Sequence, residues 1–284
     1  MRARRRASRV GSRAFPPSVA MAPNLPGSIR LVTEERRDDP PRLVHPDWSE
    51  AFPWLVQGTS ARGSGSAPFD LGLFSGGSSE AAVRTNWARL AAAAGADLVV
   101  HAPQPHGTAV RIWRDASEQA DPDERLELVD PCDGHATDRT GVLLAVTTAD
   151  CVPVFIVDPV RRSVAMVHAG WRGASSGILA EGLATMARGF ATDVADVHVH
   201  LGPAICGRCY EVGPEVFGAF GLPAPRHAAP IDVRAWLAGA AVELGVDREK
   251  VSVSRHCTRC TGSRLFSHRN GDRFRQAGFL GIRG

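Results

Sequence analysis

The chain has 284 residues, and 44% of them are hydrophobic, which is enough to bury the core of one large domain or of two ordinary ones. The formal net charge is +3, but the first 13 residues hold six arginines, so the remainder is slightly acidic. This balance argues against a domain that binds a nucleic-acid backbone. No run of about 18 apolar residues predicts a membrane span, and no signal-peptide core follows the arginines. We therefore expect a cytoplasmic protein.

Residues 1–40 are rich in Arg, Pro and Ser and show neither a helical nor a strand period. This composition predicts a disordered leader, followed by one catalytic domain over residues 41–284 whose folded part begins near Leu43. Residues 58–69 are dense in Gly and Ser. We expect them to form an ordered loop or a mobile flap, because too little chain precedes them to make a separate domain.

Alternating strand and helix patterns occupy the rest of the chain. Ser79 is typical of an N-cap and Gly95 of a C-terminal stop, which predicts a helix over the alanine-rich residues 80–94. Strand patterns follow at residues 97–101, 142–147, 152–157, 164–168, 197–201 and 251–254, and helical patterns at 175–190 and 233–244. Several of these strands are nearly continuous apolar runs, as in a sheet buried on both faces. The pattern indicates a mixed α/β domain in which helices cover a sheet.

Three short motifs place possible metal ligands where a strand meets a loop. They are QPHG at 104–107, ADCVPV at 149–154 and VHAGWRG at 167–173. Their His106, Cys151 and His168 form a ligand set that zinc favours, and three protein ligands leave a fourth position open, as in catalytic zinc sites. The spacing is too long for a local finger, so the tertiary fold would have to assemble the site. Taken singly, each residue is also typical of a structural histidine or a buried thiol.

Polar residues near these motifs offer further chemistry. Asp150 could orient an imidazole, and Arg172 lies in the small-residue stretch 169–177, whose backbone N–H groups could help to bind a phosphate or carboxylate. Glu211 follows the only tyrosine of the chain, Tyr210. A carboxylate near a zinc site could act as a general base, although such a residue is more often a solvated surface carboxylate.

Two CxxC pairs, Cys206–Cys209 and Cys257–Cys260, could in principle close a four-cysteine zinc site. The 47 residues between the pairs exceed the usual ribbon spacing of about 15 to 20. The second pair also follows a strand without the composition of a zinc knuckle. The sequence therefore disfavours a four-cysteine site, and it disfavours a thioredoxin-like role because neither pair opens a helix after a strand.

Several motifs together resemble one known family. In chain order they are TADCVPV at 148–154, VAMVHAGWRG at 164–173, LGPAICGRCYEV at 201–212, CT at 257–258, FSHRNG at 266–271 and RQAGF at 275–279. From about Trp54 to Phe279 the chain resembles the YfiH family of purine nucleoside phosphorylases, also described as multicopper polyphenol oxidase or laccase-domain proteins. The resemblance implies a single-domain layered α-β-β-α sandwich with zinc bound by His106, Cys151 and His168.

The resemblance also implies an activity: phosphorolysis of adenosine, inosine, guanosine or methylthioadenosine, and deamination of adenosine. The partners would then be purine nucleosides and phosphate, and we expect a monomer. Candidate catalytic residues are Cys151, Asp150, Arg172 and Glu211, and candidate substrate-binding residues are Gln104, Arg172, Tyr210, His268 and Arg269. Copper-dependent phenol oxidation is the alternative carried by the family description. The chain lacks the histidine clustering that a blue-copper plus trinuclear centre needs, which favours zinc.

Two other classes of function stay open. Cys151 could be a thiolate nucleophile with His106 or His168 as its base, in a cysteine hydrolase or amidase. Some bacterial relatives are described as peptidoglycan editing factors, which would cleave an amide on a cell-wall precursor. A non-enzymatic alternative is a zinc-stabilised binding module in which the four CxxC cysteines hold the metal.

Overall fold

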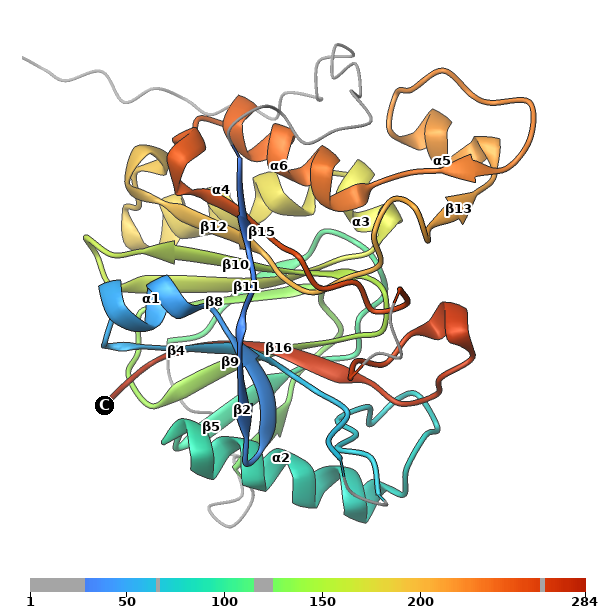
Figure 1. The fold of residues 1–284 in the computed structure, drawn as a ribbon. Helices are drawn as coiled ribbons and strands as arrows, with labels where there is room; N and C mark the ends of the chain where they lie inside the picture. The colour runs from blue at the N-terminus through green and yellow to red at the C-terminus, as the bar shows by residue number, and fades with distance from the viewer. Residues whose placement is uncertain (1–28, 65–66, 115–124, 261–263) are drawn as a thin grey trace, which may run out of the picture.

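The computed structural model describes residues 29–64, 67–114, 125–260 and 264–284. Within these ranges two seven-stranded sheets pack face to face, with helices outside them (Figure 1). Sheet I contains, in spatial order, β1 (Arg30–Val32), β15 (Val251–Ser254), β12 (His198–Leu201), β10 (Val152–Asp158), β11 (Ser163–Ala169), β8 (Gly134–Thr137) and β6 (Val110–Ile112). Sheet II contains β2 (Glu35–Asp38), β3 (Pro41–Val44), β4 (Leu55–Ser60), β16 (Gln276–Ile282), β9 (Val142–Thr148), β5 (Leu98–His101) and β7 (Leu126–Leu128).

The helices are α1 (Pro46–Ala51), α2 (Glu80–Ala94), α3 (Trp171–Ser175), α4 (Ile178–Phe190), α5 (Pro214–Ala219) and α6 (Val233–Glu243). Short 3₁₀ turns cover Val194–Asp196, Arg248–Lys250 and His268–Asn270, and a small ladder pairs β13 (Glu211–Val212) with β14 (Ala229–Pro230). Helix α2 covers the outer face of sheet II, whereas α4 and α6 cover that of sheet I (Figure 1). The α-β-β-α layering expected from the resemblance is confirmed.

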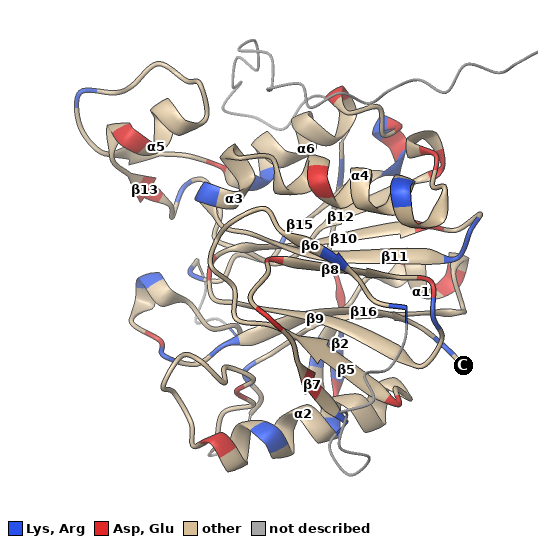
Figure 2. Ribbon diagram, turned by 180° about the vertical axis from the view of Figure 1, so that it is seen from behind, with Lys and Arg blue, Asp and Glu red and all other residues tan. Residues whose placement is uncertain are grey.

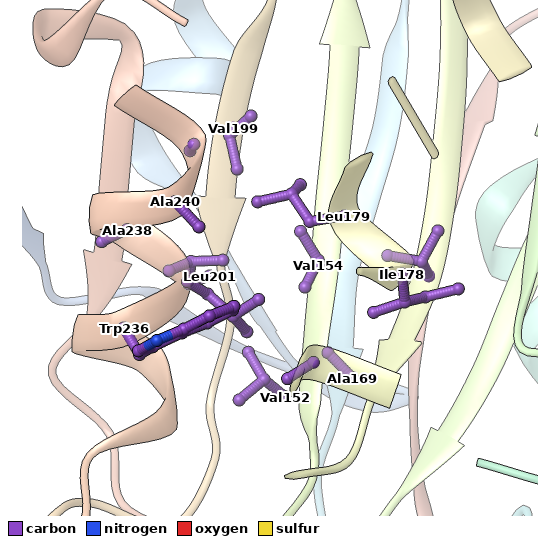
Figure 3. Packing of buried hydrophobic residues seen from close by; sticks show 14 of the residues in the cluster. Val152, Val154, Ala169, Ile178, Leu179, Val199, Leu201, Trp236, Ala238 and Ala240 are labelled. Atoms are coloured by element: carbon purple, nitrogen blue, oxygen red, sulfur yellow. The ribbon is translucent and has the colours of Figure 1, made fainter. Parts of the chain in front are cut away.

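The strand sequences explain this layering because alternate side chains enter different cores. From β10, Val152, Val154 and Ile156 pack against α4 and α6, as Figure 3 shows for the first two. The intervening Phe155 and Val157 enter the core between the sheets. The central strands therefore need apolar residues on both faces. Lys, Arg, Asp and Glu lie mainly on the outer surfaces of helices and in loops (Figure 2).

Helix α2 confirms its predicted bounds. The Ser79 side chain accepts a hydrogen bond from the Ala82 N–H, and Gly95 ends the helix in the left-handed conformation with φ 64°. The helix predicted over 175–190 is present as α4 but begins three residues later, because Gly177, which has φ 95°, separates it from the short α3. Only glycine adopts that conformation without strain, so the small-residue stretch bends the chain rather than extending one helix.

The predicted leader is too long at its C-terminal end. Strands β1 and β2 lie within residues 29–40, and β1 pairs in parallel with β15. Residues 1–28 lie outside the described residues. The loop predicted over 58–69 is also shortened, because β4 continues to Ser60. Among the described residues, no helix combines the length and apolar character needed to cross a membrane.

Candidate metal centre

The site-forming loops meet at one edge of the sandwich because of strand direction. Strands β5 and β9 run in parallel and end at this edge of sheet II, and the turn after β9 leads directly into β10 of sheet I. Strand β11 is antiparallel to β10 and ends beside its start, where Pro153 pairs with His168. Strands β12 and β15 run antiparallel to β10, so they also end there. Segments far apart in the sequence therefore form one loop cluster.

His106, Cys151 and His168 come together in this cluster. One ligand atom of each lies within 4.8 Å of those of the others, and the two imidazole rings meet edge-on with centroids 4.8 Å apart. A tetrahedral zinc ion with bonds of about 2.0–2.3 Å holds such atoms about 3.3–3.6 Å apart, so small side-chain rotations suffice for a shared ion. The sequence-predicted ligand set is thus assembled by the fold.

Asp133, which the sequence analysis did not single out, holds this set in place. Its Oδ1 accepts hydrogen bonds from the His106 backbone N–H and from His168 Nδ1, both at 3.0 Å, and its Oδ2 accepts one from the Gly107 N–H at 2.6 Å. The bond to Nδ1 leaves Nε2 of His168 as the ligand atom. His106 has φ 64°, and the paired N–H groups help to hold that unfavourable backbone. Asp133, rather than Asp150, therefore orients the imidazole.

The electrostatics of the set suit a cation. Burial raises the pKa of the Cys151 thiol, but His168 and hydrogen bonds from both imidazoles outweigh it and lower the pKa to about 6. Burial lowers the pKa of His168, but Cys151 and Asp133 raise it to about 9. These shifts favour a thiolate beside an imidazolium. A bound metal cation would replace the imidazolium proton as the counter-charge of the thiolate.

Gly170 leaves space that this centre needs. A Cβ atom there would lie 2.7 Å from Cδ2 of His106 and 3.2 Å from Sγ of Cys151. Gly173 permits a similar approach, since a Cβ there would lie 2.8 Å from the Gly107 carbonyl oxygen. Both contacts are too short, so the glycines of the HAGWRG motif let α3 pack against the His106 loop.

The three ligands open into a cavity of about 350 Å³, within the usual range for small-molecule sites. Its other lining residues are Gly72, Phe74, Ser75, Ala102, Gln104, Thr147, Thr148, Ala149, His268 and Arg275. The predicted substrate-binding residues Gln104 and His268 are among them. The Gln104 amide forms its hydrogen bonds with Thr147. Its oxygen accepts from the Thr147 N–H and hydroxyl, and its NH₂ donates to the Thr147 carbonyl.

Other predicted residues lie around the cavity without lining it. Arg172 is exposed, and its guanidinium lies over the Trp171 ring at 4.2 Å. Glu211 is exposed on β13. Asp150 uses both carboxylate oxygens, accepting from the Thr258 hydroxyl at 2.5 Å and from the Arg269 N–H at 2.8 Å. The prediction that Asp150 orients an imidazole is wrong, because its carboxylate joins two loops instead.

Tyr210 and Arg269 form a unit next to the centre. The Arg269 guanidinium lies 4.9 Å from the centroid of the Tyr210 ring and donates to the Glu211 carbonyl at 2.8 Å. Tyr210 also lines a small hollow that reaches Cys151. Burial and the Cys151 thiolate raise the pKa of Tyr210 to about 12, so its phenol stays protonated as a hydrogen-bond donor.

Phe74, Thr148 and Arg275 line the cavity and were not among the predicted site residues. Phe74 is 57% exposed, which is unusual for a large apolar ring, and it lies at the cavity. The buried Thr148 hydroxyl finds no hydrogen-bond partner among the described residues. Arg275 brings a guanidinium that also donates to the carbonyls of Asp272 and Phe274. The only sequence signal was the position of Thr148 and Arg275 as the first residues of two of the recognised motifs.

The four CxxC cysteines form one cluster, although their spacing along the chain disfavoured it. The sulfur atoms of Cys206, Cys209, Cys257 and Cys260 all lie within 4.8 Å of one another. Strands β12 and β15 are adjacent and parallel, so the loops that follow them are neighbours despite 47 intervening residues.

Known proteins share this fold and these motifs. The model of the family described as "Multi-copper polyphenol oxidoreductase laccase" matches residues 57–283. Purine nucleoside phosphorylase Rv2149c from Mycobacterium tuberculosis is 38% identical over 227 residues, which are 75% of this chain and 85% of that protein. Adenosine deaminase RL5 from an unknown prokaryotic organism is 35% identical over 194 residues, or 63% and 73% of the two chains.

The structural similarity extends over nearly the whole of a solved relative. YlmD from Geobacillus stearothermophilus superposes with a TM-score of 0.76 at 27% identity, covering 89% of this chain and 99% of that one. The family match runs through all three ligand motifs and both CxxC pairs. This chain therefore belongs to the multi-copper polyphenol oxidoreductase laccase family, the YfiH family whose motifs its sequence carries.

Proposed function

We propose that this protein is a zinc-dependent enzyme that acts on purine nucleosides, by phosphorolysis and by deamination of adenosine. The observation that carries the proposal is a three-ligand centre open to a cavity of about 350 Å³. Relatives that bear the names purine nucleoside phosphorylase and adenosine deaminase support the substrate class.

Zinc suits the donor set because one thiolate and two imidazoles are borderline-soft ligands, and when bound it would supply a Lewis acid next to the cavity. Asp133 keeps His168 in the tautomer that presents Nε2. Gly170 keeps the space between the thiol and the His106 ring free. These residues set the geometry before substrate arrives, which lowers the cost of reaching the reactive arrangement.

The cavity offers matching groups for a nucleoside. The exposed Phe74 ring provides an apolar face on which a purine can stack. Thr148 also lines the cavity, although its hydroxyl is buried, and Arg275 and His268 are the basic groups that we assign to phosphate or ribose oxygens. In phosphorolysis, a phosphate held there displaces the purine from the anomeric carbon. We therefore assign the phosphate to Arg275 rather than to Arg172, which lies outside the cavity.

The test combines metal analysis with a substrate panel. Purified protein is incubated with adenosine, inosine, guanosine and methylthioadenosine, with and without phosphate, and free base, ribose-1-phosphate (or its methylthio form) and ammonia are measured. We expect zinc in the wild type, and loss of both zinc and turnover in Cys151→Ala. The control is Cys132→Ala, which removes a buried thiol outside both metal-ligand groups. Full turnover by Cys151→Ala without zinc would refute the proposal, and copper in place of zinc would refute its metal.

A second candidate rests on the close approach of the Cys151 sulfur and the His168 ring, with pKa shifts in the directions that favour a thiolate beside an imidazolium, as in a cysteine nucleophile. In that case Cys151 would be alkylated stoichiometrically, and strong chelators would change neither alkylation nor turnover. Zinc coordination predicts that alkylation becomes fast only after the metal is removed.

A further inference from the structure

A second cluster of sulfur atoms lies apart from the nucleoside cavity. Cys206 and Cys209 belong to the loop that leaves β12, and Cys257 and Cys260 belong to the loop that leaves β15. Cys260 Sγ lies 3.4 Å from Cys206 Sγ and 3.1 Å from Cys209 Sγ. None of the four lines the cavity.

This arrangement differs from a pair of disulfides. A disulfide needs a sulfur–sulfur distance of about 2.05 Å between two partners. Here one sulfur, that of Cys260, lies close to two others, and all six cysteines of the chain are free thiols. Around a tetrahedral zinc ion with bonds of about 2.3 Å, the sulfur atoms lie about 3.8 Å apart. The observed separations need only a small expansion to reach that value.

The surroundings of Cys257 support a charged, metal-bound sulfur. Three backbone N–H groups converge on its Sγ: those of Cys206 at 3.3 Å, Arg259 at 3.4 Å and Cys260 at 3.4 Å. A neutral thiol is a weak acceptor and does not need three donors. A thiolate does, because N–H groups offset its charge and fix its direction toward the ion. These donors are an observation independent of the clustering itself.

Basic side chains accompany both pairs. Each CxxC segment carries an arginine at its third position, Arg208 and Arg259. Arg259 also donates to the Cys209 carbonyl at 3.1 Å and so crosses from one loop to the other. Four thiols that bind Zn²⁺ release four protons and leave a net charge of −2. The Arg259 guanidinium, which reaches the Cys209 carbonyl, offsets part of that charge.

We propose that Cys206, Cys209, Cys257 and Cys260 bind a structural zinc ion, distinct from the metal at the nucleoside cavity. Its four protein ligands fill the coordination sphere, so it takes no part in chemistry. Its effect is to join the loops after β12 and β15. Those loops supply the Ile205 N–H and the Thr258 hydroxyl, which bond to the carbonyl and the carboxylate of Asp150, the residue before the ligand Cys151.

The experiment counts metal ions in matched variants of the whole chain. Protein purified with zinc is analysed as wild type, as Cys209→Ser/Cys260→Ser, as His106→Ala/His168→Ala, and as the control Cys132→Ser. We expect two zinc ions per chain in the wild type and the control, and one in each double variant. With cobalt(II) in place of zinc, the thiolate-rich charge-transfer absorption should disappear only in the cysteine double variant. Failure of the nucleoside-site proposal would instead leave His106→Ala/His168→Ala with the wild-type zinc content.

A second measurement applies to the wild type alone, in case the cysteine double variant does not fold. Iodoacetamide alkylation is mapped by mass spectrometry with and without a chelator. We expect the four cysteines to be protected until the chelator is added, and then to react together. The proposal is overturned if the four cysteines react as fast without the chelator as with it. It is also overturned if a disulfide joins any two of them, or if the cluster holds iron.

Discussion

The most direct perturbation of the candidate metal centre is Asp133→Asn, which changes a buried carboxylate to an amide of nearly the same shape. Asp133 has no exposed surface and accepts three N–H donors with its two oxygens. The amide of asparagine keeps one oxygen and turns an NH₂ group toward at least one of these donors. The substitution therefore leaves a buried N–H unpaired, and it removes the charge that orients the His168 imidazole.

The expected magnitudes follow from those contacts. An unpaired buried donor costs about 1–3 kcal/mol of folding free energy. Loss of the partner that orients a metal-bound histidine weakens metal binding about 10- to 100-fold, which is about 1.4–2.7 kcal/mol. Both effects should be measurable in one preparation, since the sheets that form the core do not depend on this loop contact.

The assay is zinc affinity by competition with a chelator, together with urea denaturation of the metal-free protein. The matched control is Asp130→Asn in the same loop, where the carboxylate is 78% exposed and contacts Arg111 at 3.2 Å. An exposed pair of this kind contributes less than about 1 kcal/mol, so the control should keep wild-type affinity. A zinc dissociation constant for Asp133→Asn equal to that of the wild type would refute the assigned role of Asp133.

Three further predictions address space, charge and pH. Gly170→Ala puts a Cβ 2.7 Å from Cδ2 of His106 and 3.2 Å from Sγ of Cys151, so the affinity for zinc should fall at least about tenfold. The control is Gly218→Ala in α5, where a Cβ meets nothing within 4 Å, and it should leave the affinity unchanged. Arg275→Gln should raise the KM for phosphate about tenfold in the phosphorolysis assay, and Arg172→Gln should leave it unchanged. The opposite result would assign the phosphate to Arg172, as the sequence first suggested. Burial lowers the pKa of His45 to about 2. Because the unfolded chain takes up this proton near pH 6.5 and the folded chain does not, stability falls as the pH drops, by about 2 kcal/mol between pH 7 and pH 5. His45→Asn keeps a side-chain acceptor for the start of α1 but has no imidazole to protonate, so its free energy of unfolding should not fall between pH 7 and pH 5 through this group. Urea denaturation at both pH values measures this, and the same pH dependence in variant and wild type would contradict the role of His45.

Local chemistry explains what the sequence predicted well. Ser79 and Gly95 define α2 because capping depends on neighbouring residues alone. The apolar runs of β9, β10 and β11 likewise identify strands buried on both faces, because this pattern is contained in the few residues of each strand. The three candidate metal ligands could be singled out because each stands in a short motif at a strand end.

Contacts between distant segments explain what the sequence did not predict. Asp133 lies in a stretch without a periodic pattern, and its role appears only when the loop after β5 reaches it. The cysteine pairs were judged by their separation along the chain, yet the parallel pairing of β12 and β15 makes their loops neighbours. Phe74 gave no signal because an exposed ring in a Gly-rich loop has meaning only beside a cavity.

Two buried aspartates show how loops can carry a precise site without regular structure around it. Asp133 ties the His106 loop to His168, and the carboxylate of Asp150 ties Thr258 to Arg269. Both His106 and Asp150 have positive φ values, which cost energy unless neighbouring contacts hold them. These contacts lie outside the sheet ladders, so breaking them should loosen the ligands more than it destabilises the sandwich. The four-cysteine cluster belongs to the same loops, and a zinc ion there would keep the Asp150 contacts in place.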